Sequence, residues 1–369
     1  MTESTTAPVH TTRERVPVWD NARFLCVTLV VVGHGIQRIT YDDDYALILY
    51  LFIYAFHIPA FAMISGYFSK PGPPSAGQMK KVLTDIVLPY FIMESIWTFV
   101  QFLVEGKKGF NPSQPSWTLW FLLALGVFRL ILPYLALLRW PLLWALLLSV
   151  GAGYISNIDS TFSLSRALAI LPFFVLGWKL REWGVVDKWR LAANQTVWIR
   201  MAAIAVFAAC LAVLWIFIDS WRAIDLQHWF FYDRSYSALG EDNWYAGLIR
   251  LGLILLAAIL SAAFFVLIPR SHSWLTKLGQ ATMYIYLLHS FVLYPVRESG
   301  VLRGDHPTVL WLGGMIALCV LISFALASRP VRTIFRPLIE PKPRWLFLEQ
   351  DARQRGPSRI DPTGSRRDR

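Results

Sequence analysis

Ten long apolar runs dominate the chain, and shorter polar segments separate them. A helix that crosses a membrane needs about 20 mostly apolar residues, a length that most of these runs approach or exceed. Strands of a membrane barrel would alternate between apolar and polar positions over about ten residues, and the sequence has no such segments. The pattern therefore predicts an all-α integral membrane protein with about ten transmembrane helices. The predicted spans are 21–39, 45–68, 82–104, 117–133, 141–156, 164–180, 198–218, 244–268, 278–296 and 308–328.

Composition supports a membrane protein, since 56% of the residues are hydrophobic and 16% are charged. A soluble domain averages about 25% charged residues. The polar stretch 1–18 lacks the apolar core of a secretory signal, so we expect the first span to be retained. We predict a disordered cytoplasmic N-terminus at 1–18, a multi-span membrane domain at 19–330, and a basic, largely disordered cytoplasmic tail at 331–369. The expected location is the cell membrane, plasma or inner, with multiple passes.

The net charge of +11 indicates orientation in the membrane rather than a nucleic-acid partner. With the N-terminus in the cytoplasm, most Lys and Arg residues fall on the cytoplasmic side, as the positive-inside rule expects. Both termini and the loop Ser69–Lys81 are then cytoplasmic, whereas Asp42–Asp44 and the aromatic-rich loop Asp219–Asn243 lie outside. We therefore expect the basic surface to contact anionic lipids of the inner leaflet, and we expect no nucleic acid as a partner.

Five ionisable side chains fall inside predicted spans at similar depths. With a rise of about 1.5 Å per residue, each lies roughly 16–20 Å from the cytoplasmic end of its span. That depth is near the middle of a hydrocarbon core about 30 Å thick. An ionisable group is costly to bury in a membrane and usually marks a site or a pathway. We therefore predict that these residues line one polar cavity: His34, His57, Glu94, Arg166 and His289.

The chemistry of this set suits acyl transfer to an alcohol. A neutral imidazole such as that of His34 accepts a proton from a hydroxyl near neutral pH. Arg166 would stabilise negative charge on an acyl oxygen or hold a phosphate, and Glu94 would orient a histidine and favour its protonated form. The same groups would serve a proton relay, so a proton-coupled sugar or lipid transporter stays open at this point.

Six sequence motifs follow one another along the chain. They are Asp20–His34 (DNARFLCVTLVVVGH), Phe56–Lys70 (FHIPAFAMISGYFSK), Leu88–Trp97 (LPYFIMESIW), Ser116–Leu125 (SWTLWFLLAL), Leu164–Trp178 (LSRALAILPFFVLGW) and Tyr284–Val292 (YIYLLHSFV). With these motifs in this order, the sequence resembles the acyltransferase-three superfamily of integral membrane O-acyltransferases, most closely its fucose 4-O-acetylase-like branch. The likeness spans roughly residues 19–297.

The resemblance implies a membrane O-acetyltransferase of ten or eleven helices. Its donor would be acetyl-CoA from the cytoplasm, used as a substrate and not held as a permanent cofactor. Its acceptor would be a hydroxyl of a cell-envelope carbohydrate or glycolipid. In such enzymes the motif histidine, here His34, is catalytic, and the motif arginine, here Arg23, engages the donor near the cytoplasmic face. The alternative for Arg23 is that it extends toward anionic lipid headgroups.

The remaining candidates receive roles within the same scheme. His57 stands two residues before Pro59, so its ring would alternatively satisfy backbone groups at a helix break. Trp117 and Trp120 would bind a sugar, or alternatively serve as packing and interfacial residues. The predicted site is catalytic His34, Glu94, Arg166 and His289, donor-binding Arg23, Lys80 and Lys81, and substrate-binding His57, Trp117 and Trp120.

The sequence leaves the acyl group and its acceptor open. Transfer of an acetyl or succinyl group onto a mycolate-type glycolipid is an alternative within the same fold. Besides the lipid bilayer, candidate partners are a second copy of the chain and a separate extracytoplasmic acceptor enzyme. The three cysteines fall inside predicted spans without metal-ligand spacing, so we expect neither a bound metal nor a disulfide framework.

Overall fold

The computed structural model describes residues 16–106, 109–191, 196–302 and 308–347, and these residues form helices joined by loops, with no strand among them. The all-α prediction is therefore confirmed. The α-helices are α1 (Pro17–Ile36), α2 (Asp44–Tyr67), α3 (Ala76–Val82), α4 (Leu88–Glu105), α5 (Trp120–Leu135), α6 (Pro141–Gly153), α7 (Leu164–Glu182), α8 (Val185–Leu191), α9 (Thr196–Ile216), α10 (Ile218–Ala223), α11 (Leu226–Phe231), α12 (Ala246–Leu267), α13 (Trp274–Leu278), α14 (Thr282–Glu298), α15 (Thr308–Ala327) and α16 (Arg329–Ile339).

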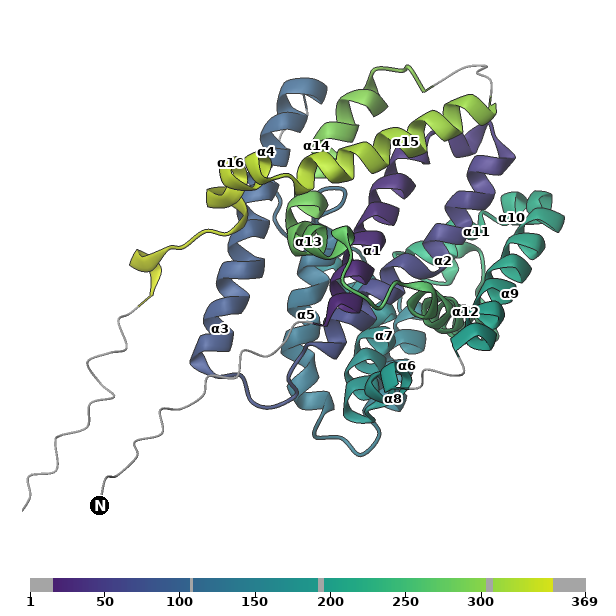
Figure 1. Ribbon diagram of the computed structural model, residues 1–369, viewed down its shortest axis with the longest axis horizontal. Helices are drawn as coiled ribbons and strands as arrows, with labels where there is room; N and C mark the ends of the chain where they lie inside the picture. The colour runs from purple at the N-terminus through teal and green to yellow at the C-terminus, as the bar shows by residue number, and fades with distance from the viewer. Residues whose placement is uncertain (1–15, 107–108, 192–195, 303–307, 348–369) are drawn as a thin grey trace, which may run out of the picture.

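Each predicted span coincides with a helix of this bundle. Figure 1 shows α1 near the centre, with α3 and α4 in one line on one side and α9 and α12 on the other. Within the described ranges, six helical stretches are long and apolar enough to cross a membrane by themselves. The helices α1, α5, α6 and α14 are shorter or more polar, so the number of about ten spans remains a prediction. The six stretches are Asp44–Tyr67, Ala76–Glu105, Thr161–Glu182, Val197–Ile216, Ala246–Leu267 and Val309–Ala327.

The third predicted span is part of a longer helix that runs through α3 and α4. Ser75 begins it with a capping box, in which its hydroxyl accepts from the Gln78 N–H and the Gln78 side chain accepts from the Ser75 N–H. Between α3 and α4, the five residues Leu83–Val87 form a π-helical turn. Such turns are rare, and those that do occur often lie at functional sites.

The structure corrects the predicted disorder at the edges of the membrane domain. The helix α1 already begins at Pro17, inside the stretch expected to be disordered. Residues 331–339 were expected to belong to a largely disordered tail. They are instead part of the helix α16, which lies beside α4 (Figure 1). The rest of both predicted disordered stretches, 1–15 and 348–369, lies outside the described residues.

Loops gather at two opposite ends of the bundle. At the first end, where α1 begins, the buried Asn21 amide donates to the carbonyls of Pro269 at 2.9 Å and Ser271 at 3.2 Å, in the loop after α12. At the second end, where α1 ends, Arg222 of α10 binds the Asp44 carboxylate of α2 at 2.6 Å. The predicted topology makes the first end cytoplasmic, and this orientation stays a prediction.

Glycines let α2 and α7 pack backbone to backbone. A Cβ on Gly66 would collide with the backbone of Phe174, and a Cβ on Gly177 would collide with the backbone of Met63. Small residues of this kind allow close helix approach inside membranes. The contact fixes α2 beside α7, and these two helices carry His57 and Arg166.

Candidate active site

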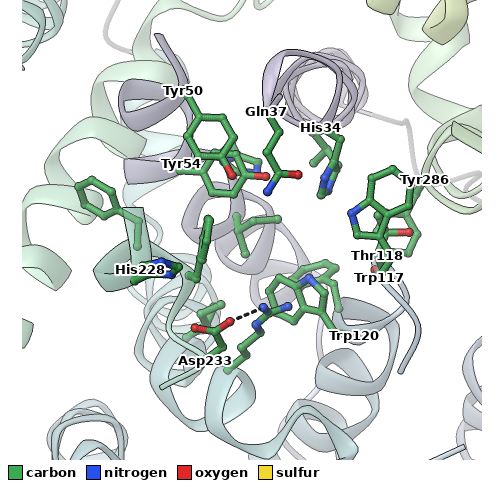
Figure 2. Close-up of a pocket in the computed structure, with 18 of the residues that line it drawn as sticks. His34, Gln37, Tyr50, Tyr54, Trp117, Thr118, Trp120, His228, Asp233 and Tyr286 are labelled. Atoms are coloured by element: carbon green, nitrogen blue, oxygen red, sulfur yellow. Dashed lines mark hydrogen bonds and ion pairs between the residues drawn. The ribbon is translucent and has the colours of Figure 1, made fainter. Parts of the chain in front are cut away.

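A cavity of about 240 Å³ lies at the second end of the bundle, and Figure 2 shows its lining. We call it the His34 cavity. A concave, mainly aromatic site with a few converging polar groups is typical of small-molecule binding. Its polar and aromatic lining is His34, Gln37, Tyr50, Tyr54, His57, Trp117, Thr118, Trp120, Phe121, Arg166, His228, Phe230, Phe231, Asp233, Arg234 and Tyr286.

Two of the predicted histidines line this cavity, and the third, His289, lies behind the lining rather than in it. His34, in the last turn of α1, and His57, within α2, both line it. His289 of α14 is fully buried next to them, with its ring centroid 5.5 Å from that of His34. The Nδ1–H of His57 donates to the Ile53 carbonyl at 2.7 Å, and the Nδ1–H of His289 donates to the Tyr286 carbonyl at 2.7 Å. In its neutral form each of these two rings then carries its lone pair on Nε2.

The ring of His34 differs from the other two histidines in its hydrogen bonding. Its Nδ1 is buried and has no hydrogen-bond partner in the part of the protein that the structure describes. The ring faces Trp117 edge-on, with centroids 5.3 Å apart. A histidine that lines a cavity and keeps a ring nitrogen unused by the protein is able to exchange a proton with a bound hydroxyl.

Arg166 enters the same cavity from the first turn of α7. Its Nη2 lies 2.8 Å from Oδ2 of Asp233, the ion pair drawn in Figure 2, and its guanidinium lies 4.7 Å from the Trp120 ring centroid. Its Nε is buried, without a hydrogen-bond partner among the described residues. Arg166 can therefore donate to an oxygen of a bound ligand while Asp233 holds its other side. Sequence reasoning missed Asp233, because it stands in a loop with several similar acidic residues and no periodic pattern.

Glu94 lies outside the lining of the His34 cavity, which corrects its predicted place in one polar space with the histidines. Glu94 is 2% exposed, and its carboxylate accepts from the Ser116 backbone N–H at 2.8 Å and from the Ser116 hydroxyl at 2.6 Å. The next residue, Trp117, has a φ of 35°, which is unfavourable for a residue with a bulky side chain. In this structure the Glu94 carboxylate therefore contacts the backbone next to Trp117, which packs against His34, and it does not contact a histidine in the hydrogen bonds of the described residues.

Aromatic residues of α2 form one wall of the cavity. The rings of Tyr50 and Tyr54 stack with centroids 4.1 Å apart, and Tyr54 lies 4.9 Å from the His57 ring. Opposite them, the Tyr286 hydroxyl of α14 donates to the carbonyl of Thr118. Sequence reasoning missed both α2 tyrosines, although their spacing of four and three residues up to His57 places all three on one helix face. It also missed other lining residues: Gln37, Thr118, Arg234 and Tyr286.

A second cavity, of about 330 Å³, reaches from the first end of the bundle, and we call it the Arg23 cavity. Arg23 lies beside it with Nη1 3.3 Å from Oδ1 of Asp20 and its guanidinium 4.5 Å from the Phe68 ring centroid. The two cavities adjoin, because four side chains line both of them: Val30, Ile58, Phe121 and Tyr286.

The predicted donor-binding lysines lie farther out at the first end. Lys81 lines a third cavity of about 700 Å³, which we call the tail cavity. Lys80 does not line it, and its ammonium lies 5.3 Å from the Phe347 ring centroid. The structure therefore separates the predicted site into three adjoining regions, with Lys81, Arg23 and His34 in successive cavities.

His228 of α11 brings a titratable group to the second end, outside the membrane-spanning helices. Burial, together with the nearby Arg234 cation, lowers its pKa below the ordinary value, and Asp225 and Asp233 oppose this shift. His228 is therefore neutral at pH 7. Within the described residues, no group of three or more His, Cys, Asp and Glu side chains is placed to hold a metal ion.

Comparison with known proteins identifies the family. The nodulation protein NolL of Mesorhizobium japonicum is 26% identical over 220 residues, which cover 53% of this chain and 57% of that protein. The chain thus spans little more than half the length of this relative. No solved structure matches the chain. The family model described as an acyltransferase domain matches residues 16–328. Since this match covers most of the chain, the protein belongs to the acyltransferase-three superfamily, a family of membrane-embedded proteins.

Proposed function

We propose that this enzyme moves an acetyl group from acetyl-CoA, bound at the first end of the bundle, to a hydroxyl of a cell-envelope carbohydrate or glycolipid bound in the His34 cavity. The observation that supports this most is the junction of the Arg23 and His34 cavities. A donor whose phosphates lie near Arg23 would extend its thioester toward His34 past the side chains at the junction.

The spacing on α1 suits such a donor. Arg23 and His34 are eleven residues apart, or about 16 Å along the helix axis, and the pantetheine arm of CoA is a long, narrow chain. Asp20 and Phe68 hold the Arg23 guanidinium at the edge of its cavity. A guanidinium there binds a phosphate in bidentate fashion. The charge of the donor then stays near the first end, and only its neutral arm enters the bundle.

The proposed reaction has one proton transfer and one acyl transfer. An imidazole nitrogen of His34 takes the proton of the acceptor hydroxyl while the hydroxyl oxygen attacks the thioester carbonyl. The C–S bond then breaks, the acetyl group stays on the acceptor oxygen, and His34 returns the proton to the sulfur, so that CoA leaves as a thiol. Arg166 donates from Nε to the oxygen that carries negative charge in the intermediate.

The lining supports a sugar as the acceptor. The rings of Trp117, Trp120 and Tyr54 offer flat apolar faces, while Gln37 and Arg166 offer hydrogen bonds. Such a mixture suits a ring with both C–H faces and hydroxyls. The family assignment favours this enzyme over the proton-coupled transporter that the ionisable residues alone would also suit.

The test compares the glycans and lipids of cells that make the wild-type protein with those of cells that lack it. Mass spectrometry should find an envelope molecule that gains the mass of an acetyl group only with the protein present. His34→Ala should remove this gain, whereas His272→Ala, a histidine in an exposed loop, should keep it. If the envelope molecule gains the mass of a succinyl group instead, acetyl-CoA is not the donor. If the acetyl gain persists in His34→Ala, His34 is not the base.

A further inference from the structure

The tail cavity is built partly by a segment outside the family match. The match ends at residue 328, whereas the segment Arg329–Phe347, α16 and the residues after it, contributes a wall of this cavity. The helices α3, α5 and α14 and the π-helical turn supply the other walls. A volume of about 700 Å³ is within the usual range for a site that binds a small molecule or a cofactor.

The tail cavity adjoins the Arg23 cavity. Leu122 and Leu125 of α5 and Met283 of α14 line both of them. Since the Arg23 cavity adjoins the His34 cavity in turn, the three cavities form a row from the C-terminal segment to His34. A ligand with its reactive end at His34 would therefore place its far end in the tail cavity.

The charges of the tail cavity suit a ligand that carries several phosphates. Lys81, Arg129 and Lys342 contribute positive charge. Of the two acids in the lining, Glu340 lies 3.3 Å from the Arg336 Nε, so it is already paired, while Asp85 accepts from the Thr84 hydroxyl at 2.8 Å. Lys81 and Lys342 form no ion pair within the described ranges.

Apolar groups complete the tail cavity. Ile86, Ile339, Pro341, Pro343 and Phe347 line it beside the cations. The planar base of a nucleotide packs against apolar and aromatic groups of this kind, while the phosphates of the nucleotide bind Lys and Arg side chains. The lining thus matches a nucleotide better than an uncharged ligand.

We propose that the tail cavity binds the adenosine 3′-phosphate end of CoA, beyond the diphosphate that lies at Arg23, and that Lys342 of the C-terminal segment contacts the 3′-phosphate together with Lys81 and Arg129. This proposal rests on the proposed use of acetyl-CoA as the donor. It assigns the segment Arg329–Phe347 a direct part in donor affinity. Phosphates of anionic lipids share the same chemistry, and the experiment separates the two sources.

The test measures CoA binding by calorimetry with the purified full chain in nanodiscs of uncharged phosphatidylcholine. Lys342→Ala should weaken the binding of CoA and of adenosine 3′,5′-bisphosphate by about fivefold to tenfold, because one charge-assisted contact is lost at a partly solvated site. Turnover of S-acetylpantetheine, which lacks the nucleotide, should stay unchanged. Lys70→Ala, which removes an exposed lysine from another loop at the first end, is the matched control.

Each outcome has a separate meaning. If wild type does not bind CoA, the proposed donor is wrong. If wild type binds CoA and Lys342→Ala binds it as tightly as Lys70→Ala does, the donor stands and the assignment of the tail cavity is wrong. If the two lysine variants differ only in nanodiscs that contain anionic lipid, the cavity binds lipid phosphate, and the nucleotide site is likewise refuted.

Discussion

Glu94 offers a prediction that separates a positioning role from a proton-transfer role. Glu94→Ala removes two short, charge-assisted hydrogen bonds to Ser116, at 2.6 and 2.8 Å. Each such bond contributes roughly 1.5–3 kcal/mol. The loss is partly offset because a buried carboxylate no longer has to be desolvated. If about 1.4–2.8 kcal/mol of the net loss disfavours the position of Trp117 that catalysis needs, the rate of acyl transfer should fall by about 10- to 100-fold.

Glu94→Gln keeps the shape of the side chain and both contacts. Its amide oxygen accepts from the Ser116 N–H, and its NH₂ donates to the Ser116 hydroxyl oxygen. We therefore expect Glu94→Gln to keep activity within about tenfold of wild type and to leave the pH profile of the rate unchanged. Ser116→Ala, which removes only the hydroxyl contact, should also lose less activity than Glu94→Ala.

The assay is the release of CoA thiol by purified protein at saturating acetyl-CoA, with donor affinity measured beside it. Donor affinity should be unchanged in all three variants, because Glu94 and Ser116 line neither the Arg23 cavity nor the tail cavity. The positioning role is refuted if Glu94→Gln is as inactive as Glu94→Ala. In that case the carboxylate takes part in proton transfer, as the residue types alone would suggest.

Three further predictions concern other parts of the path. Ile58→Trp, at the junction of the two inner cavities, should cut transfer by at least about 100-fold while CoA still binds; active enzyme would place the path elsewhere. Asp233→Asn leaves Arg166 without its charged partner and should slow transfer by up to about tenfold, whereas Asp219→Asn, in the helix α10, should not. Because the pKa of His228 is lowered, the unfolded chain binds this proton more readily, and stability falls as pH drops below about 6.5. The Tm should therefore fall less in His228→Gln than in wild type when the pH is lowered from about 7.5 to about 5.5; an equal fall would contradict the shift.

The sequence predicts the helices well because hydrophobicity alone marks them. The apolar runs coincide with helices, and the eleven-residue spacing of Arg23 and His34 on α1 assigns them to two regions of the bundle. The equal depths of His34, His57 and Arg166 also place them in one cavity. Depth is a one-dimensional quantity, and the rise per residue of a helix determines it directly.

What the sequence does not reveal depends on packing between distant segments. Glu94 has the same depth as the histidines, but the rotation of α4 turns its carboxylate toward Ser116. A depth obtained from the number of residues and the rise per residue does not reveal how a helix is rotated about its axis. Asp233 reaches Arg166 from a loop 67 residues away along the chain, and loop conformation follows from tertiary contacts that no local pattern encodes.

The helix α16 was not predicted for a different reason, since residues typical of a helix start are present in the sequence. Ser328 stands at the N-cap position, and Pro330 lies in the first turn, where proline is well tolerated. The basic composition and the prolines of the segment favoured disorder instead. Residues that pack against a membrane domain at its edge do not need the long apolar run that marks a span.

The most direct test of the account measures donor affinity and turnover separately in the two variants at the ends of α1. His34→Ala should lower turnover by about 10²- to 10⁴-fold, the usual contribution of a general base, and should bind CoA as wild type does. Arg23→Ala should bind CoA more weakly, with turnover partly restored at saturating acetyl-CoA, whereas Arg139→Ala, in the loop between α5 and α6, should behave as wild type. Normal turnover in His34→Ala would contradict the proposed base, and unchanged CoA affinity in Arg23→Ala would contradict a donor path that begins at the first end.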